Sequence, residues 1–128
     1  MLKSVTANLM VESVDDTLAF YKTALGFVEV ASVPGANGSL QFAIAAMDGQ
    51  QLMFQERGNL CEEYPILMTD KVKPSVSIYM TVDNFEGFYA EIQSRIKLLK
   101  EEHKTFYGTR EFAIQDNNGY VLTIAESN

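Results

Sequence analysis

Short apolar runs flank a polar turn in Phe112–Glu126, and nearly the same fifteen-residue pattern occurs earlier, at Phe42–Glu56. Short apolar runs bounded by turn residues predict strands, and two of them joined by a turn predict a β-hairpin. Asp48-Gly49 in the first turn suits a type I′ geometry. We therefore interpret the chain as two copies of one module. Aligned without a gap at an offset of 70, the two stretches share six identities: Phe42/Phe112, Ala43/Ala113, Ile44/Ile114, Gly49/Gly119, Leu52/Leu122 and Glu56/Glu126.

In the first module, a strand, a helix and a second strand precede the hairpin. Lys3–Val11 is rich in β-branched and apolar residues and predicts a strand. Asp15 and Asp16 suit the start of a helix, and Gly26 suits the left-handed position just after its end. Phe27–Val33 predicts the next strand. The expected order is a strand, a helix and three strands.

The second module repeats this order. Pro74–Val82 predicts a strand, and Asp83 and Asn84 suit the start of a helix. The charged stretch Ile96–Thr105 fits either the end of this helix or a solvated edge strand. The chain is expected to form a single α+β domain of two βαβββ modules, at residues 1–56 and 73–128, joined by a connection at 57–72. The predicted apolar stripe of the helix consists of Phe85, Phe88, Tyr89, Ile92 and Ile96.

The composition is that of a soluble globular protein, with 47% apolar and 21% charged residues in a chain of 128. No apolar run reaches the roughly 18–20 residues of a membrane span, and the first residues lack a signal-peptide pattern. A single cysteine, Cys61, excludes a disulfide framework within the chain. We therefore expect a cytoplasmic protein that does not enter a membrane.

The net charge of −7 comes from 17 acidic residues against 10 lysines and arginines. Nucleic-acid binding needs a basic surface, so this balance argues against nucleic acid as a partner. It favours cationic or neutral ligands through long-range attraction alone.

Short motifs in this order resemble the vicinal oxygen chelate superfamily, the group of glyoxalases, bleomycin-resistance proteins and extradiol dioxygenases. The first helix has Phe20-Tyr21 followed by Leu25-Gly26-Phe27, and the closing segment Tyr107–Ile124 reads YGTREFAIQDNNGYVLTI. This segment is most similar to the bleomycin-resistance branch. The resemblance covers the whole chain and implies a curved mixed sheet around a cavity, a small-molecule ligand and a homodimer.

Metal-dependent members of this superfamily have His, Glu or Gln ligands on the first and last strands of each module. The corresponding positions here are Thr6, Met53, Ser77 and Thr123, and hydroxyl and thioether groups are poor ligands for a divalent ion. Residues 3–11, 50–55, 74–81 and 120–125 contain no His, Asp, Glu or Cys, so a slip of one or two residues brings in no ligand stronger than an amide. The glutamines Gln50, Gln51 and Gln55 remain, with Asn8 nearby, but a site made of amides alone would bind a divalent ion poorly. We therefore predict no metal and no other cofactor.

Alternation places Leu52 and Phe54 under the first helix and places Gln51 and Met53 on the concave face. Arg110 either holds a ligand or pairs with a carboxylate, Glu111 or Glu126. Phe42 and Phe112 are either core residues or stacking platforms for a ligand. The predicted ligand-binding residues are Thr6, Asn8, Phe42, Gln51, Met53, Ser77, Tyr107, Arg110 and Thr123.

Three hypotheses follow from a scaffold that lacks the ligand set of its metal-dependent relatives. The one we favour is a metal-free protein of the bleomycin-resistance type that sequesters a small molecule without transforming it. The second is an atypical lyase, isomerase or oxidoreductase of the superfamily that uses Glu56 or Glu126. The third is a dimeric domain with a structural or regulatory role and no ligand.

Overall fold

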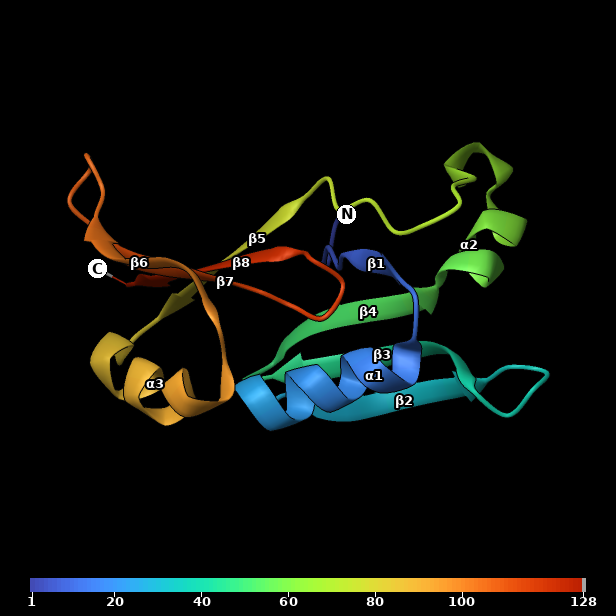
Figure 1. The fold of residues 1–128 in the computed structure, drawn as a ribbon, viewed down its shortest axis with the longest axis horizontal. Coiled ribbons are helices and arrows are strands. Elements are labelled where there is room, and N and C mark those ends of the chain that lie inside the picture. Colours follow the sequence, from blue (N-terminus) through green and yellow to red (C-terminus); the bar gives the residue numbers. More distant parts are fainter. Residues whose placement is uncertain (128) are drawn as a thin grey trace. The chain divides into compact units, whose positions relative to one another are not determined.

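The computed structural model describes residues 1–127, which form two compact units. The first unit comprises Met1–Val72 and the second begins at Lys73. Each unit contains one four-stranded mixed sheet (Figure 1). The predicted α+β class and the βαβββ order of both modules are confirmed.

In the first unit the strand order is β1-β4-β3-β2, and β1 runs parallel to β4. A π-helical turn at Tyr21–Leu25 extends the first helix, and Gly26 follows in the predicted left-handed conformation, with a φ of 93°. Asp48 and Gly49 both have positive φ, as a type I′ turn requires. The elements are β1 (Asn8–Val11), α1 (Val14–Phe20), β2 (Val28–Pro34), β3 (Leu40–Met47), β4 (Gln50–Glu56) and α2 (Arg57–Glu63), with a 3₁₀ turn at Pro65–Leu67.

The second unit has the equivalent order β5-β8-β7-β6. The charged stretch that fitted either a helix end or an edge strand is an edge strand, because β6 pairs only with β7. Ile96 lies after the helix and a 3₁₀ turn, so the predicted apolar stripe is one residue too long. The elements are β5 (Ser77–Val82), α3 (Phe85–Ile92), β6 (Leu98–Lys104), β7 (Arg110–Gln115) and β8 (Val121–Glu126).

Two local predictions need correction. The first strands of the modules are shorter than predicted, because residues 3–7 and 74–76 lie outside β1 and β5. Ser13, rather than either aspartate, caps α1 by accepting a hydrogen bond from the Asp16 amide. The Asp15 carboxylate accepts one from the Leu40 amide, which ties the helix start to β3.

The register of the two hairpins differs by one residue, which corrects the gapless alignment of the repeat. In the first unit Ala43 lies opposite Phe54, whereas in the second Phe112 lies opposite Ile124. The second hairpin has one extra residue at its turn, so the structural counterpart of Phe112 is Ala43 and not Phe42. A shift of one residue reverses the face of a strand, so the two phenylalanines point to opposite sides of their sheets.

Each sheet packs one face against its helix. Leu52 and Phe54 are buried on the α1 side as predicted, and the Phe54 ring lies 4.8 Å from that of Tyr21, between ring centroids. In the second unit Phe112 is fully buried and contacts the rings of Phe85 and Tyr89 on α3. The opposite face of each sheet, called the open face here, has its side chains directed away from the helix. Candidate functional residues are therefore those on the two open faces.

Candidate functional site

A cleft of about 630 Å³ lies on the open face of the first sheet. All four strands of the sheet contribute residues to it, and α2 with the residue that follows it supplies one wall. Small-molecule sites are typically concave, with a few polar groups placed among apolar ones. The residues that line the cleft are Asn8, Val33, Gln41, Phe42, Gln55, Asn59, Glu62, Glu63 and Tyr64.

A hydrogen-bonded set of side chains, called the amide network here, surrounds Gln55, which is only 7% exposed. Its amide nitrogen donates to Asn59 Oδ1 at 2.7 Å and to Glu63 Oε1 at 2.9 Å. Its carbonyl oxygen accepts from Asn8 Nδ2 at 2.9 Å. Asn59 Nδ2 in turn donates to Gln41 Oε1 at 3.3 Å. These bonds fix the orientation of each amide, so the cleft offers donors and acceptors at fixed positions.

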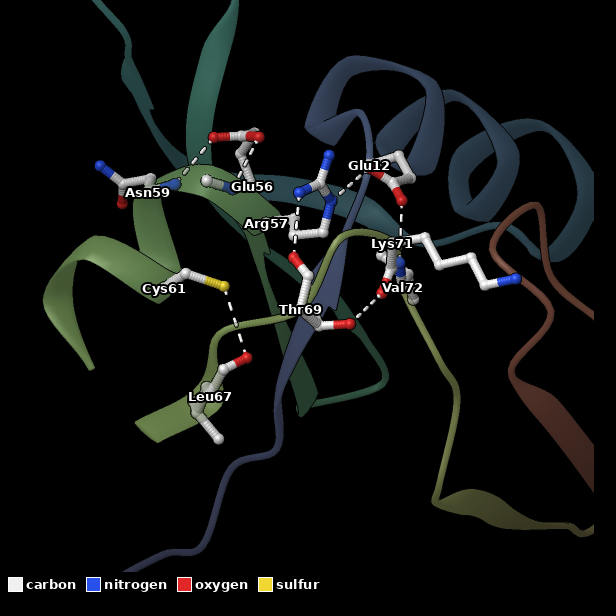
Figure 2. A network of polar contacts seen from close by, with 10 residues as sticks. Glu12, Glu56, Arg57, Asn59, Cys61, Leu67, Thr69, Lys71 and Val72 are labelled. Carbon is white, nitrogen blue, oxygen red and sulfur yellow. Dashed lines mark hydrogen bonds and ion pairs between the residues drawn. The ribbon is translucent and has the colours of Figure 1, made fainter. Parts of the chain in front are cut away.

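Side-chain contacts at the start and at the end of the connection hold helix α2 in place (Figure 2). The Glu56 carboxylate caps α2 by accepting from the amides of Gly58 and Asn59, both at 2.9 Å. The Arg57 guanidinium pairs with Glu12 at 2.9 Å and donates to the Thr69 carbonyl, and the second oxygen of Glu12 accepts from the Val72 amide. Helix α2 is therefore held in place as one wall of the cleft.

We expect loss of the α2 cap to destabilise the first unit. Glu56→Ala leaves two helix amides without their acceptor, which typically costs about 1 kcal/mol. Urea unfolding should show this loss, whereas Glu29→Ala removes an exposed carboxylate from β2 and should have no comparable effect. Equal stability of the two variants would mean that Glu56 does not hold α2.

The structure brings two of the five predicted residues of the first module into the cleft, Asn8 and Phe42. Thr6 lies before β1. Met53 on β4 pairs with Asn8 on β1, and not with Thr6. Gln51 is exposed nearer the turn. The α2 side chains were missed because residues 57–72 were interpreted as a connection, although Glu56 followed three residues later by Asn59 is compatible with a capped helix.

The open face of the second sheet has a different polar cluster. Tyr79 on β5 and Tyr107 before β7 both donate hydrogen bonds to Oε2 of Glu111, at 2.6 Å and 2.7 Å. Thr123 lies opposite Tyr79, while Ser77 lies opposite Val121 near the strand end. Of the predicted residues of this module, only Tyr107 takes part in the cluster. Tyr79 and Glu111 were missed because the expected ligand positions were Ser77 on β5 and Thr123 on β8, and Glu111 on β7 was considered only as a possible partner of Arg110.

Glu111 should contribute stability that depends on pH. The Tyr79 hydroxyl is the main cause of its lowered pKa, against the opposing effect of burial, with a further contribution from Tyr107. A carboxyl with a lowered folded-state pKa stabilises the protein above its unfolded pKa, and this stabilisation is lost as the pH falls through the folded pKa. In urea unfolding, the stability difference between wild type and Glu111→Gln should therefore shrink below about pH 4.3. A difference that stays constant down to pH 3 would contradict this assignment.

Arg110 is on the face that packs against α3, and not on the open face. It pairs with Glu126 and Glu86, both at 3.1 Å, and with Glu102 at 3.7 Å. Its guanidinium carbon lies 4.9 Å from the centre of the Phe85 ring. Of the two alternatives for Arg110, the structure contains the pairing with Glu126, and Glu111 is not its partner.

The side chains at the expected metal positions do not fit a divalent ion. The cross-strand pairs on the open faces are Asn8 with Met53 and Tyr79 with Thr123, which offer amide, thioether, phenol and hydroxyl groups. Within residues 1–127 there is no group of three or more His, Cys, Asp and Glu side chains that could hold a metal. Across the same residues, no helix is both long and apolar enough to cross a membrane.

The two four-stranded units have the same βαβββ order, and the first of them has a cleft. Solved structures share this duplicated α+β scaffold. A "glyoxalase-related enzyme" from Fulvimarina pelagi is 18% identical, with a TM-score of 0.77 over 98% of this chain and 89% of its own. A superfamily member from Sphaerobacter thermophilus is 18% identical, with a TM-score of 0.78 over 99% and 98%. A "Lactoylglutathione lyase" from Agrobacterium tumefaciens is 15% identical, with a TM-score of 0.74 over 99% and 96%.

The sequence profile of the glyoxalase/bleomycin resistance protein/dioxygenase superfamily matches residues 3–124. The chain belongs to this superfamily. No curated protein sequence matches the chain at a significant level. The structural neighbours above are too distant in sequence to show more than the fold.

Proposed function

We propose that the protein is a metal-free small-molecule-binding protein that acts in the cytoplasm by sequestration, as in the bleomycin-resistance branch. The observation that supports this most strongly is the amide network around buried Gln55, at the floor of a cleft of about 630 Å³. Oriented amides can recognise a ligand's polar groups, and the rings of Phe42 and Tyr64 can cover its apolar parts.

The cleft lining favours a neutral or cationic ligand over an anion. Glu62 and Glu63 contribute carboxylates, and the lining includes no lysine, arginine or histidine. An anionic ligand would meet unfavourable charge and no compensating cation. The first screen should therefore use cationic glycopeptides of the bleomycin type and neutral aromatic metabolites.

Binding without conversion is the better-supported function because the two candidate catalytic carboxylates have structural partners. Glu56 caps α2, and Glu126 pairs with Arg110. Arg110 lowers the pKa of Glu126, which makes that carboxylate a weaker base. An enzymatic function of the superfamily would therefore need other groups.

A thermal-shift screen with chelator-treated protein tests the proposal. A ligand present at about 100 times its Kd should stabilise the folded protein by about 2.7 kcal/mol. We expect at least one compound of the panel to do so without added metal. Stoichiometric zinc, nickel, manganese or iron in protein purified without chelator would contradict the metal-free assignment.

We also propose a homodimer, as the family resemblance implies. Strand β2 is an edge strand whose Val28, Val30 and Val33 are exposed, and such edges favour association. Light scattering should give twice the chain mass of 14.3 kDa. A single-chain mass at micromolar concentration would contradict the dimer.

A further inference from the structure

A buried carboxylate without a cationic partner lies on the open face of the second sheet. Glu111 is 6% exposed, and within residues 1–127 no lysine, arginine or histidine nitrogen lies within 4.0 Å of it. Its neighbour in sequence, Arg110, pairs with three carboxylates on the opposite face. Charges removed from water are costly unless they are paired. Within the described residues, Glu111 therefore has no cation beside it to offset the cost of burying its charge.

The hydrogen bonds of Glu111 keep it charged and leave one oxygen open. The Tyr79 and Tyr107 hydroxyls donate to the same atom, Oε2, and hydrogen bonds of this kind lower the pKa of the carboxyl. Within the described chain, Oε1 accepts no hydrogen bond. Every buried side-chain oxygen of the described residues has a hydrogen-bond partner. Because Oε1 has none, it is accessible to solvent. The arrangement thus presents an ionised acceptor to an incoming donor.

Aromatic rings flank this acceptor. Tyr79 and Tyr107 are 53% and 56% exposed although their hydroxyls are engaged, so their rings remain accessible. Strand β8, between β5 and β7, places Ala125 opposite Glu111 and Thr123 opposite Tyr79 on the open face. A carboxylate beside accessible tyrosine rings suits an ammonium group, which can donate to the oxygen and lie against the rings.

His103 and Lys100 act on Glu111 only at longer range. His103 lies opposite Glu111 in the register of β6, and its Nδ1 is bonded to the carbonyl of Glu101. Lys100 lies further along the same strand. Both favour the charged form of Glu111, but neither forms an ion pair with it. The position next to Oε1 is thus left for a ligand.

We propose that Glu111, Tyr79 and Tyr107 form a binding site for a primary ammonium group on the second unit. Oε1 of Glu111 accepts a hydrogen bond from the ammonium, and the two tyrosine rings contact the carbon atoms beside it. The site contains no residue of the cleft in the first unit, so its test is independent of the test of the proposed function.

Titration of the ¹⁵N-labelled full chain with benzylamine, followed by NMR, tests this site. We expect saturable shifts of the backbone amides of Tyr79, Glu111 and Thr123, with a Kd of about 1–10 mM for so small a probe. Benzyl alcohol has the same ring without the charge and should bind at least about tenfold more weakly, a difference of roughly 1.4 kcal/mol.

Two variants that each remove one negative charge distinguish binding at this site from general electrostatic attraction to the protein. Glu111→Gln should weaken benzylamine binding at least about tenfold, whereas Glu101→Gln removes an exposed carboxylate from β6 and should leave binding within about twofold. Tyr79→Ala removes one ring but keeps the carboxylate, and should weaken binding several-fold. Equal binding by Glu111→Gln and wild type, equal binding of benzyl alcohol, or shifts confined to residues 1–72 would each overturn the proposal.

Discussion

Phe112→Ala should be among the most destabilising single substitutions in this protein, with an expected loss of about 3–5 kcal/mol in the free energy of unfolding. Phe112 is fully buried, and its ring contacts those of Phe85 and Tyr89. Truncation removes the ring and leaves a cavity between α3 and the second sheet, which the surroundings fill only in part by relaxing. Urea unfolding followed by circular dichroism measures the loss.

Two further phenylalanines serve as matched controls for this prediction. Phe42→Ala should cost much less, because Phe42 is half-buried on the open face of its sheet. Phe106→Ala should fall within about 0.5 kcal/mol of wild type, because Phe106 is fully exposed. If Phe42→Ala cost as much as Phe112→Ala, the two residues would be equivalent after all and the one-residue difference in hairpin register would be wrong.

Gln55→Met should have the largest effect on ligand binding, with an expected loss of at least about tenfold in affinity. Methionine is close to glutamine in length but has no amide. Asn8, Asn59 and Glu63 would each lose one hydrogen bond and with it their fixed orientation. The unpaired groups should also lower the free energy of unfolding by about 1–3 kcal/mol.

Isothermal titration with the best stabiliser from the thermal-shift panel measures the effect on affinity. Gln50→Met is the matched control, because Gln50 is exposed at the start of the same strand and does not line the cleft. The control should bind the stabiliser as wild type does. Equal affinity in Gln55→Met and Gln50→Met would place the ligand outside the amide network.

The sequence was sufficient to predict the order of elements within each βαβββ module, because these elements depend on local chemistry. Alternation in the hairpins, the left-handed Gly26 and the Asp48-Gly49 turn are properties of a few adjacent residues, and all are confirmed. The predicted burial of Leu52 and Phe54 follows from the same alternation.

Register could not be predicted, because it depends on a turn rather than on the strands. The extra residue in the second hairpin turn moves Phe112 to the opposite face from Phe42, although three consecutive identities argue for equivalence. For the same reason Glu111, the counterpart of Phe42 in the register, reaches the open face. A gapless alignment pairs Phe42 with Phe112, and so it does not predict a buried carboxylate at the position equivalent to Phe42.

Helix α2 could not be predicted, because contacts distant in sequence hold it. It is only seven residues long, and Arg57 is fixed by Glu12, which lies 45 positions earlier. Isolated helices of this length are unstable in water. The cleft wall was therefore absent from the sequence-based site, and with it Asn59 and Glu63 of the amide network.

The most direct test of the account is the ligand-induced shift in melting temperature of chelator-treated protein, compared between wild type and Gln55→Met. A metal-free site in the cleft predicts a shift in wild type that needs no added metal and that is lost in the variant. A shift that appears only after zinc, nickel, manganese or iron is added, or that persists undiminished in Gln55→Met, would contradict a metal-free site in the cleft.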